Sequence, residues 1–109
     1  MKYNIFQLKT NRILDIVLNY TGISEEEFYK LKNKRNYARV RNVCIKLMYD
    51  KGIHYNDIAE SLGMTMQNVY YQIAKLKDWN KNDKFEFERL LYKELSEEIE
   101  NKNSDLSMY

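Results

Sequence analysis

Residues 53–79, IHYNDIAESLGMTMQNVYYQIAKLKDW, predict two short helices joined by a tight turn. The first helix should span about 55–62 and the second about 65–77. Gly63 can adopt the left-handed conformation that the turn needs, and Ala59 is small where the two helices approach each other. The apolar residues that should pack the helices together are Ile58, Ala59, Leu62, Val69, Ile73 and Leu76. This spacing is typical of a helix-turn-helix.

The composition indicates one small all-α domain. The chain has 109 residues, three Gly and no Pro, which is enough for a modest core but not for a large catalytic architecture. We expect about six helices, with a helix-turn-helix domain over 1–79 and an acidic helix with a frayed tail over 80–109. No apolar run approaches the ~20 residues of a membrane span, and the N-terminus lacks the apolar segment of a signal peptide, so we expect a cytoplasmic protein.

The inventory of reactive side chains argues against an enzyme. One cysteine excludes an internal disulfide and a thiolate metal cluster, and one histidine leaves little for zinc. Cys44 falls on the apolar side of a helical segment, where it is expected to be a buried small side chain. We therefore expect no catalytic residue, no metal and no cofactor.

Charge is distributed unevenly along the chain. The net charge is +2, but residues 1–77 hold 13 Lys/Arg against 7 Asp/Glu, whereas residues 78–109 hold 5 against 9. A basic body with an acidic end fits a module that binds a polyanion and turns its last helix away from it. An ordinary charged surface is the alternative.

The amino-terminal segment predicts a helix that starts near Asn11, with Thr10 or Asn11 as its N-cap and Gly22 as its stop signal. Residues 1–9 should form an ordered arm or a frayed leader. The apolar positions of the helix recur at helical spacing: Ile13, Ile16, Val17 and Tyr20.

A capping box follows at residues 24–27. The Ser24 hydroxyl can accept from the amide of Glu27, and the Glu27 carboxylate can reach back. This box should open a short helix that ends near residue 32 and buries Phe28 and Leu31.

The most basic stretch of the chain is 30–52, which holds eight Lys/Arg and a single acidic residue. We expect it to begin as a loop, KNKRNY at 32–37, and to continue as a helix from about 38 to 51 that Gly52 terminates.

The last helix should begin with a second capping box at residues 83–86 and run to about 101. An apolar stripe with four-residue spacing follows its length. It should either dock on the chain's own core or form a homodimer or protein contact. The stripe consists of Phe87, Leu91, Leu95 and Ile99.

The outward side of the second motif helix is the main candidate binding surface. With Thr65 as N-cap, the positive end of the helix dipole should lie at residues 66–68. Gln and Asn can pair with adenine in the major groove, whereas Tyr and Lys can reach phosphate. Tyr70 is expected to be partly buried. The candidate major-groove residues are Thr65, Met66, Gln67, Asn68, Tyr71, Gln72 and Lys75.

A second candidate surface is basic. An arginine in a mobile loop beside a groove-bound helix can enter the minor groove, where the negative potential is enhanced. His54 should cap the first motif helix or lie near phosphate. The candidate loop and backbone contacts are Lys32, Lys34, Arg35, Arg39, Arg41 and His54.

The order of these parts resembles the C-terminal DNA-binding domain of the bacterial replication initiator DnaA, a Trp-repressor-like helix-turn-helix domain. Three segments carry the resemblance: TGISEEEFYKLKNKR at 21–35, ARVRNVCIKLMYDKG at 38–52 and DIAESLG at 57–63. By position, Arg35 matches the minor-groove arginine of that family, and Arg39 and Arg41 match basic positions near phosphate.

The signature of that family is changed in this chain. Where the initiators carry Arg-Asp-His-Ser/Thr-Thr-Val, residues 64–69 read MTMQNV, so that only Val69 remains. No ATPase domain accompanies the motif. The resemblance therefore implies the fold and general DNA binding, but not the initiator's own DNA site.

Two functions follow as hypotheses. The first is sequence-specific binding of double-stranded DNA in transcription or replication control, for example in a phage or mobile element. The alternative is a protein-interaction module whose acidic last helix binds a replication or transcription protein.

Overall fold

The chain is all-α, as its composition predicts. The computed structural model describes residues 5–31 and 34–106, and side chains within 10–31 and 34–101. The described part contains six α-helices and two short 3₁₀ turns and no strand. They are α1 (Ile5–Thr21), α2 (Glu25–Leu31), α3 (Arg35–Asp50), α4 (Tyr55–Leu62), α5 (Met66–Leu76), η1 (Trp79–Lys81), η2 (Asp83–Phe85) and α6 (Glu86–Leu106).

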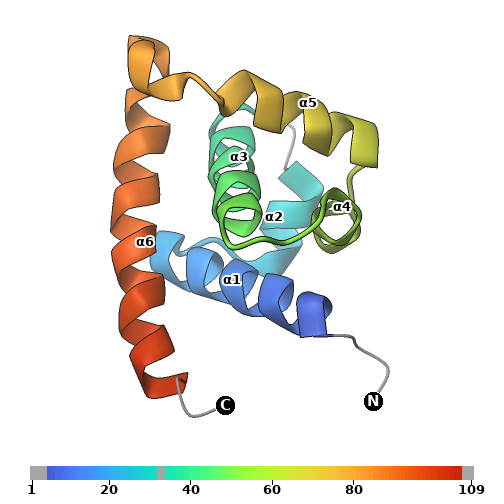
Figure 1. The fold of residues 1–109 in the computed structure, drawn as a ribbon, viewed down its shortest axis with the longest axis vertical. Helices are drawn as coiled ribbons and strands as arrows, with labels where there is room; N and C mark the ends of the chain where they lie inside the picture. The colour runs from blue at the N-terminus through green and yellow to red at the C-terminus, as the bar shows by residue number, and fades with distance from the viewer. Residues whose placement is uncertain (1–4, 32–33, 107–109) are drawn as a thin grey trace.

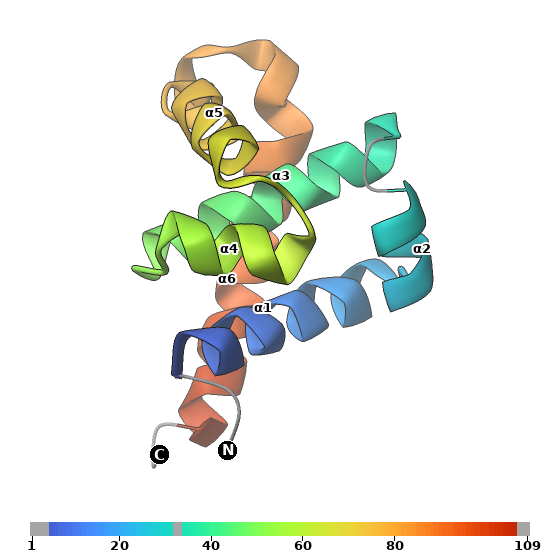
Figure 2. The same cartoon turned by 90° about the vertical axis from the view of Figure 1, so that its right-hand side faces the viewer.

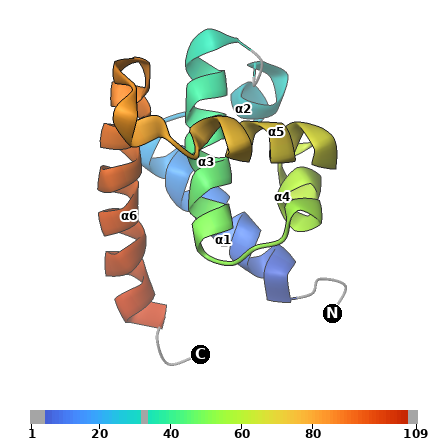
Figure 3. The same cartoon turned by 45° about the horizontal axis from the view of Figure 1, so that its top comes forward.

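Helix α3 is the centre of the fold. Helices α4 and α6 lie on opposite sides of it, α5 crosses it, and α1 crosses on a further side (Figures 1 and 3). Helix α2 lies at the end where α3 begins, next to the end of α1 (Figure 2). Because α3 touches every other α-helix, it positions both motif helices.

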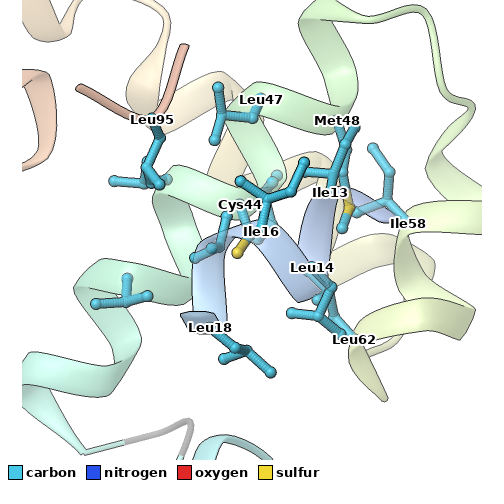
Figure 4. Packing of buried hydrophobic residues seen from close by; sticks show 14 of the residues in the cluster. Ile13, Leu14, Ile16, Leu18, Cys44, Leu47, Met48, Ile58, Leu62 and Leu95 are labelled. Carbon is cyan, nitrogen blue, oxygen red and sulfur yellow. The ribbon is translucent and has the colours of Figure 1, made fainter. Parts of the chain in front are cut away.

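One continuous core joins these helices (Figure 4). Val17, Val43, Cys44, Leu62 and Leu95 are each fully buried, and they come from α1, α3, α4 and α6. Cys44 therefore fills space, as expected, and burial raises the pKa of its thiol to about 12. A protonated thiol of this kind is not a nucleophile at neutral pH.

Helix α1 begins earlier than its sequence signals predict. It starts at Ile5, so Thr10 is not an N-cap but a buried residue inside the helix. Thr10 precedes Ile13 by three residues and Val17 by seven, and once the helix continues it shares their inward side. The stop at Gly22 is confirmed, with a φ of 73°.

The capping box that opens α2 is confirmed. The Glu27 amide donates to the Ser24 hydroxyl at 3.1 Å, and the Ser24 amide lies 3.5 Å from the Glu27 carboxylate. The Ser24 hydroxyl, which donates to the Glu27 carboxylate at 3.1 Å, and then the Ser24 amide hold the pKa of Glu27 below its usual value. Phe28 is buried as expected, but Leu31 is only partly buried.

Helix α3 begins at Arg35, three residues before its expected start. Lys34 has an extended conformation and its carbonyl accepts from the Ala38 amide at 2.7 Å, which makes it the first residue of the helical ladder. The expected basic loop is therefore largely the first turn of α3, because nothing in Arg-Asn-Tyr stops a helix.

Helix α6 docks on the chain's own core. Leu91, Leu95 and Ile99 are buried in the same core as α1 and α3, so a partner cannot reach them while α6 is docked. Phe87 remains 44% exposed. The helix is preceded by η2, for which Asn82 is the cap, accepting from the Lys84 amide at 3.1 Å.

None of the helices in the described ranges is both long and apolar enough to cross a membrane.

Candidate nucleic-acid interface

The two motif helices have the expected bounds and turn. Gly63 ends α4 in the left-handed conformation (φ 63°, ψ 40°), and the Met64 amide donates to the Ala59 carbonyl at 2.9 Å. Thr65 caps α5, since its hydroxyl accepts from the Asn68 amide at 3.1 Å. Val69 is fully buried against the core, which sets the rotation of α5 about its axis. The remaining sides of α5 point away from the core.

The outward face of α5 is exposed. Gln67, Asn68, Tyr71 and Lys75 are exposed, and Met66 is 47% exposed. No residue of α5 is acidic. We call this surface the α5 face; it comprises Met66, Gln67, Asn68, Tyr71, Gln72 and Lys75.

Gln72 differs from its neighbours on the α5 face. It is partly buried, and its side-chain amide donates to the side-chain Oδ1 of Asn68 at 3.4 Å. This contact orients both amides toward one another along one helix side, since they are four residues apart. The Gln72 Oε1 is buried without a hydrogen-bond partner among the described residues, so Asn68 is the amide of this pair that is open to a base edge.

The prediction that Tyr70 is partly buried is wrong. Tyr70 is 58% exposed and leans on Tyr55 rather than on the core. Tyr70 lies beside the buried residues Val69 and Leu76 of α5. Lys77 comes seven residues, or about two helical turns, after Tyr70 and therefore lies on the same side of the helix. The i, i+7 spacing of these two residues was the available signal for a second exposed surface.

The basic residues of the predicted loop are divided by the structure. Lys34 and Arg35 are exposed at the amino-terminal end of α3, and α5 crosses that helix further along (Figures 2 and 3). Lys32 lies outside the described residues. Lys34 and Arg35 can thus accompany the α5 face, although as a helix start and not as a flexible arm.

Arg39 is held by α6. Its Nε lies 3.4 Å from a carboxylate oxygen of Glu88, and its guanidinium lies 5.1 Å from the centre of the Phe87 ring. The Glu88 side chain is 5% exposed, and that oxygen has no hydrogen bond of good geometry among the described residues. The ion pair is therefore the principal compensation for a buried carboxylate.

Arg41 is the clearest departure from the predicted contacts. It is 6% exposed, and its Nε and Nη2 donate to the Asn42 side chain at 3.3 and 3.1 Å. Burial lowers the pKa of its guanidinium. Since neighbours cover Arg41, it cannot contact a phosphate without a rearrangement of α3, and we remove it from the candidate surface.

His54 caps α4 as expected. Its Nδ1 accepts from the Asn56 amide at 3.2 Å, and the side chain is otherwise exposed. Its ring packs at a tilt on Tyr55. His54 thus has a structural role that leaves Nε2 for solvent or a ligand.

The described residues hold no group of three or more His, Cys, Asp or Glu side chains that could bind a metal ion. What the geometry brings together is an exposed helix face of amides, a phenol and an amine, with two further basic residues at the start of α3. Such a surface offers hydrogen-bonding groups and positive charge to a ligand.

No protein-family model, curated protein or solved structure matches the chain at a significant level.

Proposed function

We propose that this chain binds double-stranded DNA, with α5 in the major groove. The observation that carries the proposal is the α5 face: the second helix of a capped helix-turn-helix, exposed along its outer side and free of carboxylates. A major groove admits one α-helix, and amide side chains can read adenine there. Its role would be transcription or replication control, for example in a phage or mobile element.

Electrostatics supports the same orientation. Lys75 lies on the α5 face, and Lys34 and Arg35 add positive charge at the exposed start of α3. These cations would contact phosphates on either side of the groove, which fixes register without reading sequence. The resemblance to the DnaA domain implies the same arrangement, and membership of that family remains a prediction.

A duplex-binding titration with a charge-reversed pair of variants tests the proposal. We expect fluorescence anisotropy to show binding at 50 mM salt and micromolar protein, with a salt slope of about −0.9 per phosphate contact. Lys75→Glu should weaken binding and make the slope shallower by about 0.9. Lys93→Glu, the same change at an exposed position of α6, is the matched control. Absence of binding at 50 mM salt would overturn the proposal.

Sequence reading is tested separately, because Lys75 cannot report on it. Selection from a random duplex library would give the preferred site. Changing Gln67 and Asn68 together to Ala should then flatten the preference by about 1–3 kcal/mol for each adenine pair lost. An unchanged preference would mean that another part of the surface reads the bases.

A second candidate function is protein binding through the outer side of α6. It is favoured by Phe87 and Leu90, which are 44% and 58% exposed although both are large and apolar. Acidic residues, among them Glu94 and Glu97, surround them along the helix, so a basic partner would fit. A pull-down with Leu90→Ser tests this: a partner retained by the variant does not use this surface.

A further inference from the structure

A small hollow lies beside the α5 face, where α3, α4 and α5 meet. Its volume is about 220 Å³, and its walls include Tyr49 of α3, Tyr55 of α4 and Tyr70 of α5. Lys46 and Lys77 complete the polar part of the lining. None of the residues that line the hollow belongs to the α5 face, so the hollow is a separate surface.

Three tyrosine rings border the hollow, two of them parallel and the third at a right angle, and we call them the tyrosine wall. Tyr49 and Tyr55 are nearly parallel, with ring centres 5.9 Å apart and an angle of 9° between planes. Tyr70 meets Tyr55 edge-on, with ring centres 5.5 Å apart. Tyr49 and Tyr70 keep 41% and 58% of their surface exposed. A chain that uses three tyrosines from three helices in this way leaves open aromatic surface on which another planar ring can stack.

The charged residues that line the hollow are both basic, Lys46 and Lys77. No carboxylate is among the described residues that line the hollow. Lys46 forms an ion pair at 2.9 Å with Asp50, which is not one of the lining residues. Lys77 is exposed, and within the described part of the chain it forms no ion pair. Asp78 is the adjacent acidic residue and also lies outside the lining. Partial burial, and then the neighbouring Tyr49 and Tyr70, raise the pKa of Tyr55. Like any tyrosine, Tyr55 is protonated at neutral pH, where its hydroxyl can donate a hydrogen bond.

Size restricts what can occupy the hollow. A volume of about 220 Å³ is below the ~300–1,000 Å³ of common small-molecule pockets. It suits one planar ring system, with any attached anionic group left at the rim near Lys77. Aromatic side chains beside basic ones are the combination that proteins use to stack single nucleobases and track their phosphates.

We propose that this hollow binds a nucleobase that carries a phosphate, with the base packed against the exposed surfaces of Tyr49 and Tyr70 and its phosphate at Lys77. The base can come from a free nucleotide or from an unpaired position of a nucleic-acid strand. The site goes beyond duplex binding by the α5 face, and the free nucleotide probes it without any duplex.

The test uses Tyr70→Ala, with Tyr71→Ala as its matched control. Both tyrosines are exposed, at 58% and 62%, and they are neighbours in the chain, but only Tyr70 lines the hollow. In one arm, adenosine monophosphate is titrated and followed by NMR shifts. In the other, a blunt duplex is compared with the same duplex carrying one unpaired terminal adenine.

Tyr70→Ala should weaken the binding of adenosine monophosphate, or the preference for the duplex with the unpaired adenine, about fivefold or more. Tyr71 belongs to the α5 face, so Tyr71→Ala should weaken both duplexes alike but leave nucleotide binding and the preference for the unpaired adenine within about twofold. Lys77→Gln should weaken the binding of adenosine monophosphate but not the binding of adenosine, which has no phosphate. Nucleotide binding identifies a free nucleotide as the source, and a preference for the unpaired adenine identifies a strand.

The proposal is overturned if adenosine monophosphate does not bind at millimolar concentration and the two duplexes bind alike, or do not bind at all. It is also overturned if both tyrosine variants lose nucleotide binding, or the preference for the unpaired adenine, equally. Nucleotide binding without any duplex binding would sustain this site and defeat the proposed function. If the chain binds duplexes, Tyr70→Ala leaves that binding unchanged and no nucleotide binds, the proposed function is sustained and this site is defeated.

Discussion

Helices α5 and α6 both pack on α3, yet they expose opposite charge. Helix α5 buries Val69 and Leu76 and presents a face without a carboxylate. Helix α6 buries Leu91, Leu95 and Ile99 and exposes several glutamates. Both are amphipathic helices with a similar pattern of apolar residues. They differ in the residues with which their charged side chains interact.

The glutamates of α6 find that partner within the chain. Glu88 pairs with Arg39 at 3.4 Å, and Glu100 lies 3.8 Å from Lys51, so α6 is paired with α3 at two places. The second pair is exposed and contributes little. Because α6 compensates this side of α3, the uncompensated positive charge lies at the start of α3 and on α5. An acidic carboxy-terminal helix can thus neutralise one side of a basic central helix, so that the remaining positive charge is concentrated on the other side of the fold.

The largest expected effect comes from undocking α6. Leu95 is fully buried, and Leu95→Ala should lower the free energy of unfolding by about 2–5 kcal/mol, because a cavity replaces the lost side chain. Thermal or denaturant unfolding followed by circular dichroism measures this. Leu90→Ala, at a position 58% exposed, is the control and should change stability by under about 0.5 kcal/mol. Equal effects of the two variants would mean that α6 does not hold the core.

The next effect separates the arginines of α3. Arg39→Met should lower the free energy of unfolding by about 1–3 kcal/mol, because it leaves the buried Glu88 carboxylate uncompensated. It should change duplex affinity little. Arg35→Met, at an exposed position, should leave stability within about 0.5 kcal/mol and weaken duplex binding. Unfolding curves and anisotropy on the same proteins decide the matter, and a stable but DNA-deficient Arg39→Met would contradict this division.

Local signals explain why the motif itself could be predicted. The bounds of α4 and α5 depend on Gly63, on the Thr65 cap and on apolar spacing, all of which act within a few residues. The starts of α1 and α3 were misplaced because a threonine and a basic run also occur inside helices. Thr10 has the right chemistry for an N-cap, but the core surrounds it.

The candidate site was less predictable because its charges are paired over long distances. Nothing near Arg39 in the sequence indicates that Glu88 holds it, and nothing near Arg41 indicates its burial. The hollow was missed for the same reason, since its tyrosines come from three helices. Periodicity predicts which side of a helix faces inward, but it does not predict which outward side chains another helix covers.

The smallest effect concerns the proton that helps hold α6 to α3. The Tyr92 hydroxyl of α6 donates to the Asp50 carboxylate of α3, which Lys46 also contacts at 2.9 Å. Burial, and then the hydrogen bond and charge of Asp50, raise the pKa of Tyr92 to about 12 from its ordinary value of 10.0. The folded state therefore binds this proton more tightly than the unfolded state does. The stabilisation is fully present below pH 10 and is lost as pH rises through about 12.

Tyr92→Phe should lower the free energy of unfolding by about 1 kcal/mol at pH 7. Between pH 10 and 12 the difference from the parent chain should shrink, as the parent loses the proton that the variant never had. Denaturant unfolding at pH 7, 10 and 11.5 measures the trend, and a difference that grows with pH would show that Tyr92 does not bind its proton more tightly in the folded chain.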